Sequence, residues 1–78
     1  MKNKLSKDEL RKYLEEMFKG KSMIFRRDPD LNRFIAPGSL ANRDSEGRGI
    51  DGATKIGNKT FYPRSSTIDL LVEISDAI

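Results

Sequence analysis

The chain has 78 residues, of which 36% are hydrophobic and 35% are charged, and 15 basic against 12 acidic side chains give it a formal net charge of +3. Its length excludes a two-domain enzyme with a separate cofactor domain and leaves room for one small domain with a modest core. Cysteine and histidine are both absent, which excludes disulfide frameworks, thiol nucleophiles, imidazole bases and the usual zinc sites.

The first predicted element is a helix over residues 7–19. Ser6 and Glu9 have the spacing of a capping box, in which each side chain accepts a hydrogen bond from the backbone amide of the other residue, and Gly20 is placed to end the helix. Leu5 is expected to pack on Leu10 ahead of the first turn. Apolar residues then recur at helical spacing, namely Leu10, Tyr13, Leu14, Met17 and Phe18. The other face is charged, so the helix is expected to lie on a core with that face in solvent.

A short apolar run follows at residues 23–25, and it fits either a strand or the approach to the next helix. Arg26 and Arg27 come directly after it and could contact phosphate. We expect them to form ion pairs with Asp28 and Asp30 instead, because these carboxylates are close in sequence.

Two short helices are predicted next. An N-cap aspartate and a proline at the first helical position predict a helix over residues 29–34. A second helix is expected to open at Pro37 or Ser39 and to end at Gly47. Joined by a tight turn, the two helices form a helix-turn-helix candidate over residues 28–47.

A glycine-rich loop separates the second short helix from a predicted β-hairpin. Two strand-like runs, residues 54–56 and 59–62, flank Gly57 and Asn58, a two-residue turn of the kind that hairpins use. Pro63 is expected to end the second strand.

The last predicted element is a helix that Ser66 caps and that reaches about Asp76. Its apolar side consists of Ile68, Leu71, Val72 and either Ile74 or Leu70. The order of elements predicts a mainly helical α+β domain. We expect a small winged helix-turn-helix with a two-stranded hairpin wing over residues 53–63 and an additional N-terminal amphipathic helix over residues 6–20.

The charges are unevenly distributed along the chain. Residues 1–64 carry all 15 basic and nine of the 12 acidic side chains, a net charge of +6, whereas residues 65–78 carry a net charge of −3. This pattern favours one face that is directed at a polyanion. The sequence shows neither a membrane-spanning stretch nor an apolar signal sequence, so we expect a soluble, intracellular protein.

The candidate DNA-contacting residues lie on the second short helix, in the loop after it and around the hairpin. They are Ser39, Asn42, Arg43, Ser45, Arg48, Lys55, Asn58, Lys59 and Arg64. Asparagine pairs with adenine and arginine with guanine through two hydrogen bonds, and lysine or arginine neutralises phosphate. Asp44 on the same helix is a further polar group that could reach phosphate oxygens or base edges.

Local interpretations stay open for the same residues. Asn42 equally fits a role at a helix end, and Arg43 equally fits an ion pair with Glu46. A lysine near a hairpin tip commonly protects a strand edge.

A resemblance to a known family extends over residues 36–71. The strings that carry it are Pro37-Gly38-Ser39-Leu40-Ala41-Asn42-Arg43-Asp44-Ser45-Glu46-Gly47-Arg48-Gly49, Lys55-Ile56-Gly57-Asn58-Lys59-Thr60-Phe61-Tyr62-Pro63-Arg64-Ser65-Ser66 and Ile68-Asp69-Leu70-Leu71. In that order they resemble the excisionase-like winged-helix proteins of phages and mobile elements, which are related to the DNA-binding domains of the mercury-resistance-regulator superfamily. The resemblance implies a recognition helix around residues 39–45, a wing tipped by Gly57 and Asn58, and a final helix packed beneath.

The chain departs from that family at two positions and in one element. Arg43 stands where the family usually has an aromatic residue, commonly tryptophan, and Ile50 stands where a proline tends to follow the Gly-x-Gly loop. The helix over residues 7–19 has no place in the minimal family pattern, so we interpret it as an added dimerisation or partner-docking element.

The sequence therefore predicts a non-enzymatic protein of a phage or mobile element that binds double-stranded DNA and needs no cofactor. It would act as a recombination directionality factor that bends attachment-site DNA, or as a small transcriptional regulator. We expect it to bind as a homodimer or a cooperative array on DNA. An integrase or a polymerase component is a further expected partner, and a membrane is not. The resemblance also implies a location in the cytoplasm of a bacterial host, associated with the nucleoid.

The alternative is a protein-interaction module such as a phage-encoded inhibitor, because Asp44 and Glu46 beside Arg43 would repel phosphate. An enzyme is the least favoured class. Asp28 with Asp30, or Asp44 with Glu46, would suit a metal-dependent nuclease, but helix capping and the helix dipole explain these pairs without catalysis.

Overall fold

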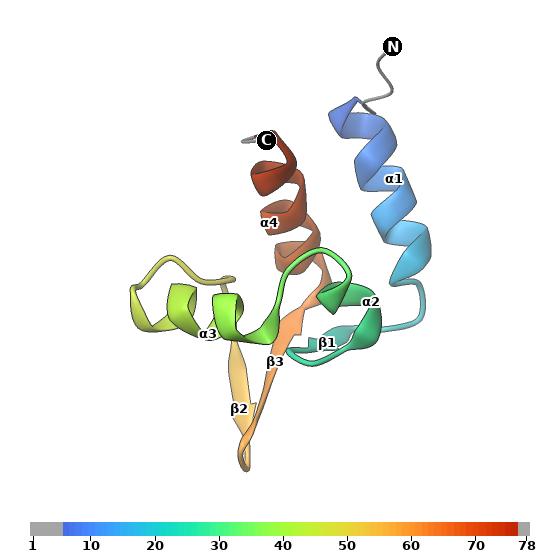
Figure 1. The fold of residues 1–78 in the computed structure, drawn as a ribbon. Helices are drawn as coiled ribbons and strands as arrows, with labels where there is room; N and C mark the ends of the chain where they lie inside the picture. Colours follow the sequence, from blue (N-terminus) through green and yellow to red (C-terminus); the bar gives the residue numbers. More distant parts are fainter. Residues whose placement is uncertain (1–5, 77–78) are drawn as a thin grey trace.

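The computed structural model describes residues 6–76 and has a small α+β fold. The elements follow one another as α1 (Lys7–Met17), β1 (Met23–Phe25), α2 (Pro29–Asn32), α3 (Pro37–Ser45), β2 (Thr54–Ile56), β3 (Lys59–Pro63) and α4 (Arg64–Asp76). The strands form one antiparallel sheet of three, ordered β1-β3-β2. Figure 1 shows α1 beside α4, with the β2–β3 hairpin extending away from both. The expected contact of Leu5 with Leu10 lies outside the described residues.

The first two helices start at the predicted capping signals. The capping box of α1 is formed in both directions, since the Ser6 amide donates to Glu9 Oε1 at 3.0 Å and the Glu9 amide donates to Ser6 Oγ at 3.2 Å. The Asp28 carboxylate caps α2 by accepting a hydrogen bond from the Asp30 amide at 2.8 Å. α1 ends at Met17, a little before the predicted end.

α2 is shorter than predicted, because it ends at Asn32. The Asn32 side-chain amide donates to the carbonyls of Arg26 at 2.9 Å and of Ile35 at 3.1 Å. The turn after α2 is thus held by this side chain rather than by further helical hydrogen bonds. α3 then opens at Pro37, and the alternative opening at Ser39 is wrong.

α4 begins earlier than predicted, at Arg64, so Ser66 lies inside the helix and does not cap it. β3 passes into α4 without a loop. The Arg64 amide donates to the Ser22 carbonyl at 3.1 Å, and the Thr67 hydroxyl donates to the Pro63 carbonyl at 2.8 Å. These hydrogen bonds stabilise the direct passage from strand to helix.

The apolar run at residues 23–25, which fitted either a strand or the approach to the next helix, is strand β1. It pairs with one edge of β3, and β2 pairs with the other edge. Ile24 lies opposite Tyr62, and both side chains are buried. Phe25 lies opposite Phe61 on the other face of the sheet, with the ring centroids 5.2 Å apart.

The core receives buried side chains from all four helices of the described residues. Its members are Leu14, Phe18, Ile24, Leu31, Leu40, Ile50, Tyr62, Ile68, Leu70, Leu71 and Val72. Of the two alternatives on α4, Leu70 is buried and Ile74 is partly buried against the core. Within residues 6–76, no helix has the length and apolar character needed to traverse a lipid bilayer.

Candidate nucleic-acid interface

The N-terminal half of α3 presents small polar side chains to solvent. Leu40 is buried in the core and Asp44 turns inward, so Ser39 and Asn42 stay exposed on the surface of the helix. Asp44, which could have reached DNA as a polar group of this helix, is engaged elsewhere, because Arg26 and a buried tyrosine hold its carboxylate beneath the helix.

Arg26, Asp44 and Tyr62 form a closed polar network under α3. The Arg26 guanidinium donates to the Tyr62 hydroxyl at 2.8 Å and pairs with the Asp44 carboxylate at 2.6 Å, while the Tyr62 hydroxyl donates to the same carboxylate at 2.8 Å. The hydrogen bond to Tyr62 and the neighbouring Asp44 carboxylate raise the pKa of Arg26, although burial opposes them. Burial raises the pKa of the Tyr62 phenol. The network joins α3 to the sheet and fixes the angle between α3 and the hairpin.

The predicted ion pairs of Arg26 and Arg27 with Asp28 and Asp30 are not formed. Lys21 forms ion pairs with both carboxylates instead, with its Nζ 2.7 Å from Oδ2 of Asp28 and 3.5 Å from Oδ2 of Asp30. Burial alone would raise the pKa of Asp28, but the Lys21 ammonium and the backbone amides of α2 lower it overall. Arg27 is exposed, and no ion pair engages it within residues 6–76.

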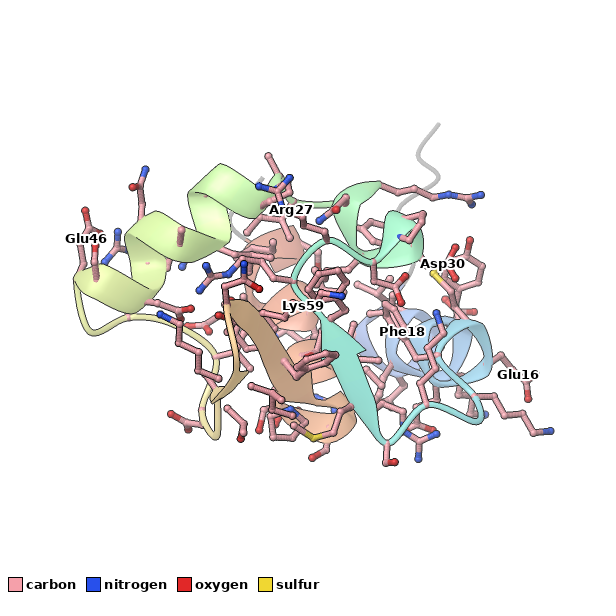
Figure 2. All side chains as sticks on the ribbon, turned by 90° about the horizontal axis from the view of Figure 1, so that it is seen from below. Glu16, Phe18, Arg27, Asp30, Glu46 and Lys59 are labelled. Carbon is pink, nitrogen blue, oxygen red and sulfur yellow. The ribbon has the colours of Figure 1, made fainter. Side chains whose placement is uncertain are left out.

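A groove runs between the N-terminal half of α3 and the hairpin. It is lined by Phe25, Arg26, Arg27, Pro37, Gly38, Ala41, Asn58, Lys59 and Thr60. Asp44 neutralises Arg26, which leaves the exposed Arg27 and Lys59 as the cations of the groove, and none of its described lining residues is acidic. The Lys59 ammonium lies 5.8 Å from the centroid of the Phe25 ring. Figure 2 shows Arg27 and Lys59 in the view from below.

Only part of the predicted residue set meets at this groove. Asn58 and Lys59 line it, and Ser39 and Asn42 are exposed on the adjoining surface of α3. Lys55 is also exposed and lines a neighbouring groove along β2. The hairpin tip and the start of α3 therefore share one region of the surface.

Three further predicted residues are engaged elsewhere. The Ser45 hydroxyl donates to a carbonyl of its own helix at 3.1 Å. Arg48 forms an ion pair with Glu46, and its Nε donates to the Glu46 carboxylate at 3.1 Å. The alternative in which Arg43 pairs with Glu46 is therefore wrong. Arg43 lines a groove to which α4 contributes two carboxylates.

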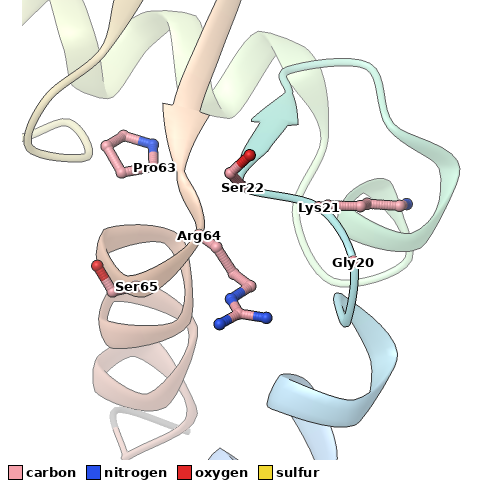
Figure 3. Close-up of a pocket in the computed structure, with 6 residues that line it drawn as sticks. All are labelled: Gly20, Lys21, Ser22, Pro63, Arg64 and Ser65. Atoms are coloured by element: carbon pink, nitrogen blue, oxygen red, sulfur yellow. The ribbon is translucent and has the colours of Figure 1, made fainter.

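Arg64 lies apart from the groove beside α3. It lines a separate depression with Gly20, Lys21, Ser22, Pro63 and Ser65, which Figure 3 shows between the start of α4 and the chain that leads from α1 to β1. A strand rises about 3.3 Å per residue, so Arg64 stands about 16 Å along β3 from Lys59. A single footprint that contains both Lys59 and Arg64 would have to extend along the whole strand.

Arg27 and Gly38 are among the residues that line the groove but were not among the predicted contacts. A signal for Arg27 was present in the sequence, because an N-cap aspartate directs its carboxylate at the helix amides and is a poor partner for the residue before it. Gly38 has open space around the position that a β-carbon would take. The backbone at the start of α3 is accessible for this reason.

No family model, no curated protein and no solved structure matches this chain. The candidate interface is therefore identified by the geometry of the molecule itself. Three features define it, namely the small polar surface of α3, the cationic groove beside that helix and the extended hairpin.

Proposed function

We propose that this protein binds double-stranded DNA as a winged helix-turn-helix, with α3 in the major groove and the β2–β3 hairpin against the adjoining backbone or minor groove. The observation that carries the proposal is the groove beside α3, because Arg27 and Lys59 line it without an acidic residue among the described ones. Phosphate groups are attracted to such a surface, and no carboxylate in its wall repels them.

The shape of α3 supports the same binding mode. A helix with its side chains is about 10–12 Å wide and the major groove is about 12 Å wide, so one helix fills the groove. Ser39 and Asn42 would face the base edges, where an asparagine amide pairs with adenine. The network of Arg26, Asp44 and Tyr62 would hold α3 and the hairpin at a fixed angle, which lowers the entropic cost of contacting one duplex with both.

For the biological role, we propose a recombination directionality factor or a small transcriptional regulator of a phage or mobile element. The resemblance of residues 36–71 to the excisionase-like proteins supports this role. A formal net charge of +3 gives one copy only weak attraction to DNA. Binding as a dimer or as several adjacent copies would supply the missing affinity.

A salt-dependent titration tests DNA binding. A labelled random-sequence duplex is titrated with protein at salt concentrations between about 50 and 200 mM. The double variant Arg27→Ala/Lys59→Ala is expected to bind more weakly and to reduce the slope of log K against log salt by about 2, because two phosphate contacts are lost.

The matched control is Lys12→Ala/Lys19→Ala, which removes the same charge from exposed positions on and just after α1. It should leave the slope nearly unchanged, since these lysines lie outside the groove. Equal losses in the two double variants, or no binding of the wild-type protein at low salt, would overturn the proposal.

A protein-interaction module is the second candidate, and an apolar groove between α1 and α4 favours it. The groove is lined by Leu10, Leu14, Phe34, Leu71, Ile74 and Ser75, and Phe34 is 42% exposed. Two results together would assign the function to this groove. The wild-type protein would bind no duplex at low salt, and the Phe34→Ala variant would sediment differently from the wild type.

A further inference from the structure

The tip of the β2–β3 hairpin combines two lysines with one bare apolar side chain. Residues 55–59 are all exposed, and the hairpin extends away from the helices (Figure 1). Ile56 is 64% exposed, more than Tyr13, Met23 or Phe34, the other exposed large apolar side chains of the described residues. Burial in the core therefore does not explain the isoleucine at this position.

The cross-strand neighbour of Ile56 leaves it uncovered. Ile56 lies opposite Lys59 in the hairpin register, and a lysine in such a place can lay its methylene chain over an apolar neighbour. Here the Lys59 ammonium lies 5.8 Å from the centroid of the Phe25 ring on β1, across β3 from Ile56. Lys59 thus extends away from Ile56, which stands free at the end of the hairpin.

The charges around Ile56 favour a nucleic acid over an apolar protein surface. Residues 52–68 contain Lys55, Lys59 and Arg64 and no acidic residue. An apolar partner surface would have to desolvate the two lysines of the tip without neutralising them, which is costly. The phosphates on the two sides of a DNA groove would neutralise both.

We propose that Ile56 is a wedge that enters the minor groove and inserts between neighbouring base pairs, while Lys55 and Lys59 neutralise the flanking phosphates. This inference rests on the DNA-binding function proposed above. Apolar side chains that enter the minor groove unstack a base step in this way and kink the duplex toward the major groove. The protein then not only binds DNA but also bends it, and Ile56 is the side chain that causes the bend.

Ring closure of short DNA fragments tests the wedge. Linear fragments of about 110 bp are shorter than the persistence length of about 150 bp, so ligase circularises them poorly unless a protein bends them. Each protein is added at the concentration that gives equal occupancy in its own binding isotherm, which separates bending from affinity. The wild-type protein is expected to raise the yield of circles, and Ile56→Ala is expected to lower that yield about fivefold or more.

Two matched variants accompany Ile56→Ala. Ile56→Leu keeps an apolar wedge and is expected to retain ring closure. Met23→Ala removes a side chain that is 40% exposed at the opposite end of the sheet, where Met23 pairs with Pro63, and it should leave ring closure unchanged. Thermal unfolding of Ile56→Ala should match that of the wild type, since Ile56 lies outside the core.

The outcomes separate the wedge from DNA binding itself. If the wild-type protein binds the fragments without raising the yield of circles, or if Ile56→Ala closes rings as well as the wild type at equal occupancy, the wedge is overturned. If the wild-type protein binds no duplex at low salt, the proposed function fails instead.

Discussion

A β-carbon on Gly49 would stand 1.7 Å from Oδ1 of Asp44, so the loop after α3 passes directly against the carboxylate that anchors this helix. Arg26 and Tyr62 donate their hydrogen bonds to the other oxygen of the same carboxylate. The lack of a side chain at Gly49 is therefore a condition for the network beneath α3.

Gly49→Ala is expected to displace the Asp44 carboxylate and to destabilise the protein by about 2 kcal/mol. Gly38→Ala is the matched control, because a β-carbon there meets nothing within 4 Å. Alanine in place of glycine inside a helix stabilises by about 0.5–1 kcal/mol. Urea unfolding measures both changes, and a similar response to the two substitutions would contradict the close approach at Gly49.

The pair of Lys21 and Asp28 predicts a loss of stability in acid. Because the folded protein lowers the pKa of Asp28 below its ordinary 3.8, the stabilisation is complete above that pH and is lost as the pH falls through the folded-state pKa. Lys21→Met should cost less than about 1 kcal/mol at neutral pH, since the pair is partly exposed. It should also flatten the decline below pH 3.8. Urea unfolding across this range is the measurement, and a decline as steep as that of the wild type would count against the pair.

Tyr62 predicts a second loss of stability, in alkali. Burial raises the pKa of its phenol above the ordinary 10.0, so the stabilisation is complete below that pH and disappears as the pH rises through the folded-state pKa. Tyr62→Phe should cost about 1 kcal/mol at neutral pH through its lost hydrogen bonds. The variant should also show a shallower alkaline decline in denaturant unfolding. An unaltered decline would mean that other groups cause it.

The separation of Lys59 from Arg64 predicts unequal effects on DNA binding. Lys59→Ala is expected to weaken binding to every sequence and to reduce the salt slope by about 1. Arg64→Ala removes the same charge from the opposite end of β3 and should leave affinity and slope nearly unchanged. The titration described for the groove measures both. Equal effects would place the duplex along the whole length of the strand.

Local signals were sufficient to predict the helix starts. The capping box needs only Ser6 and Glu9 at the right spacing, and the cap of α2 needs only Asp28 just before a proline. The strand at residues 23–25 could not be decided in the same way, because its hydrogen bonds go to β3, far along the chain. Its pairing is a tertiary event that the short apolar run does not encode by itself.

Side-chain partners were harder to predict for the same physical reason. Arg26 has Asp28 two residues away, yet its carboxylate partner is Asp44, which α3 brings across the end of β1. Asp28 is unavailable to Arg26, because its carboxylate caps α2 and pairs with Lys21. The composition of the candidate site follows from such long-range packing. Asn58 and Lys59 therefore share a groove with α3, whereas Arg64 does not.

β3 passes directly into α4, so no loop separates the strand that carries the hairpin tip from the last helix. The hairpin tip at Lys59 and the far end of α4, which lines the apolar groove against α1, thus belong to one continuous strand and helix. A change in the direction of the hairpin cannot be absorbed by a loop at this point, so it would have to be accommodated where α4 packs against α1 and the sheet.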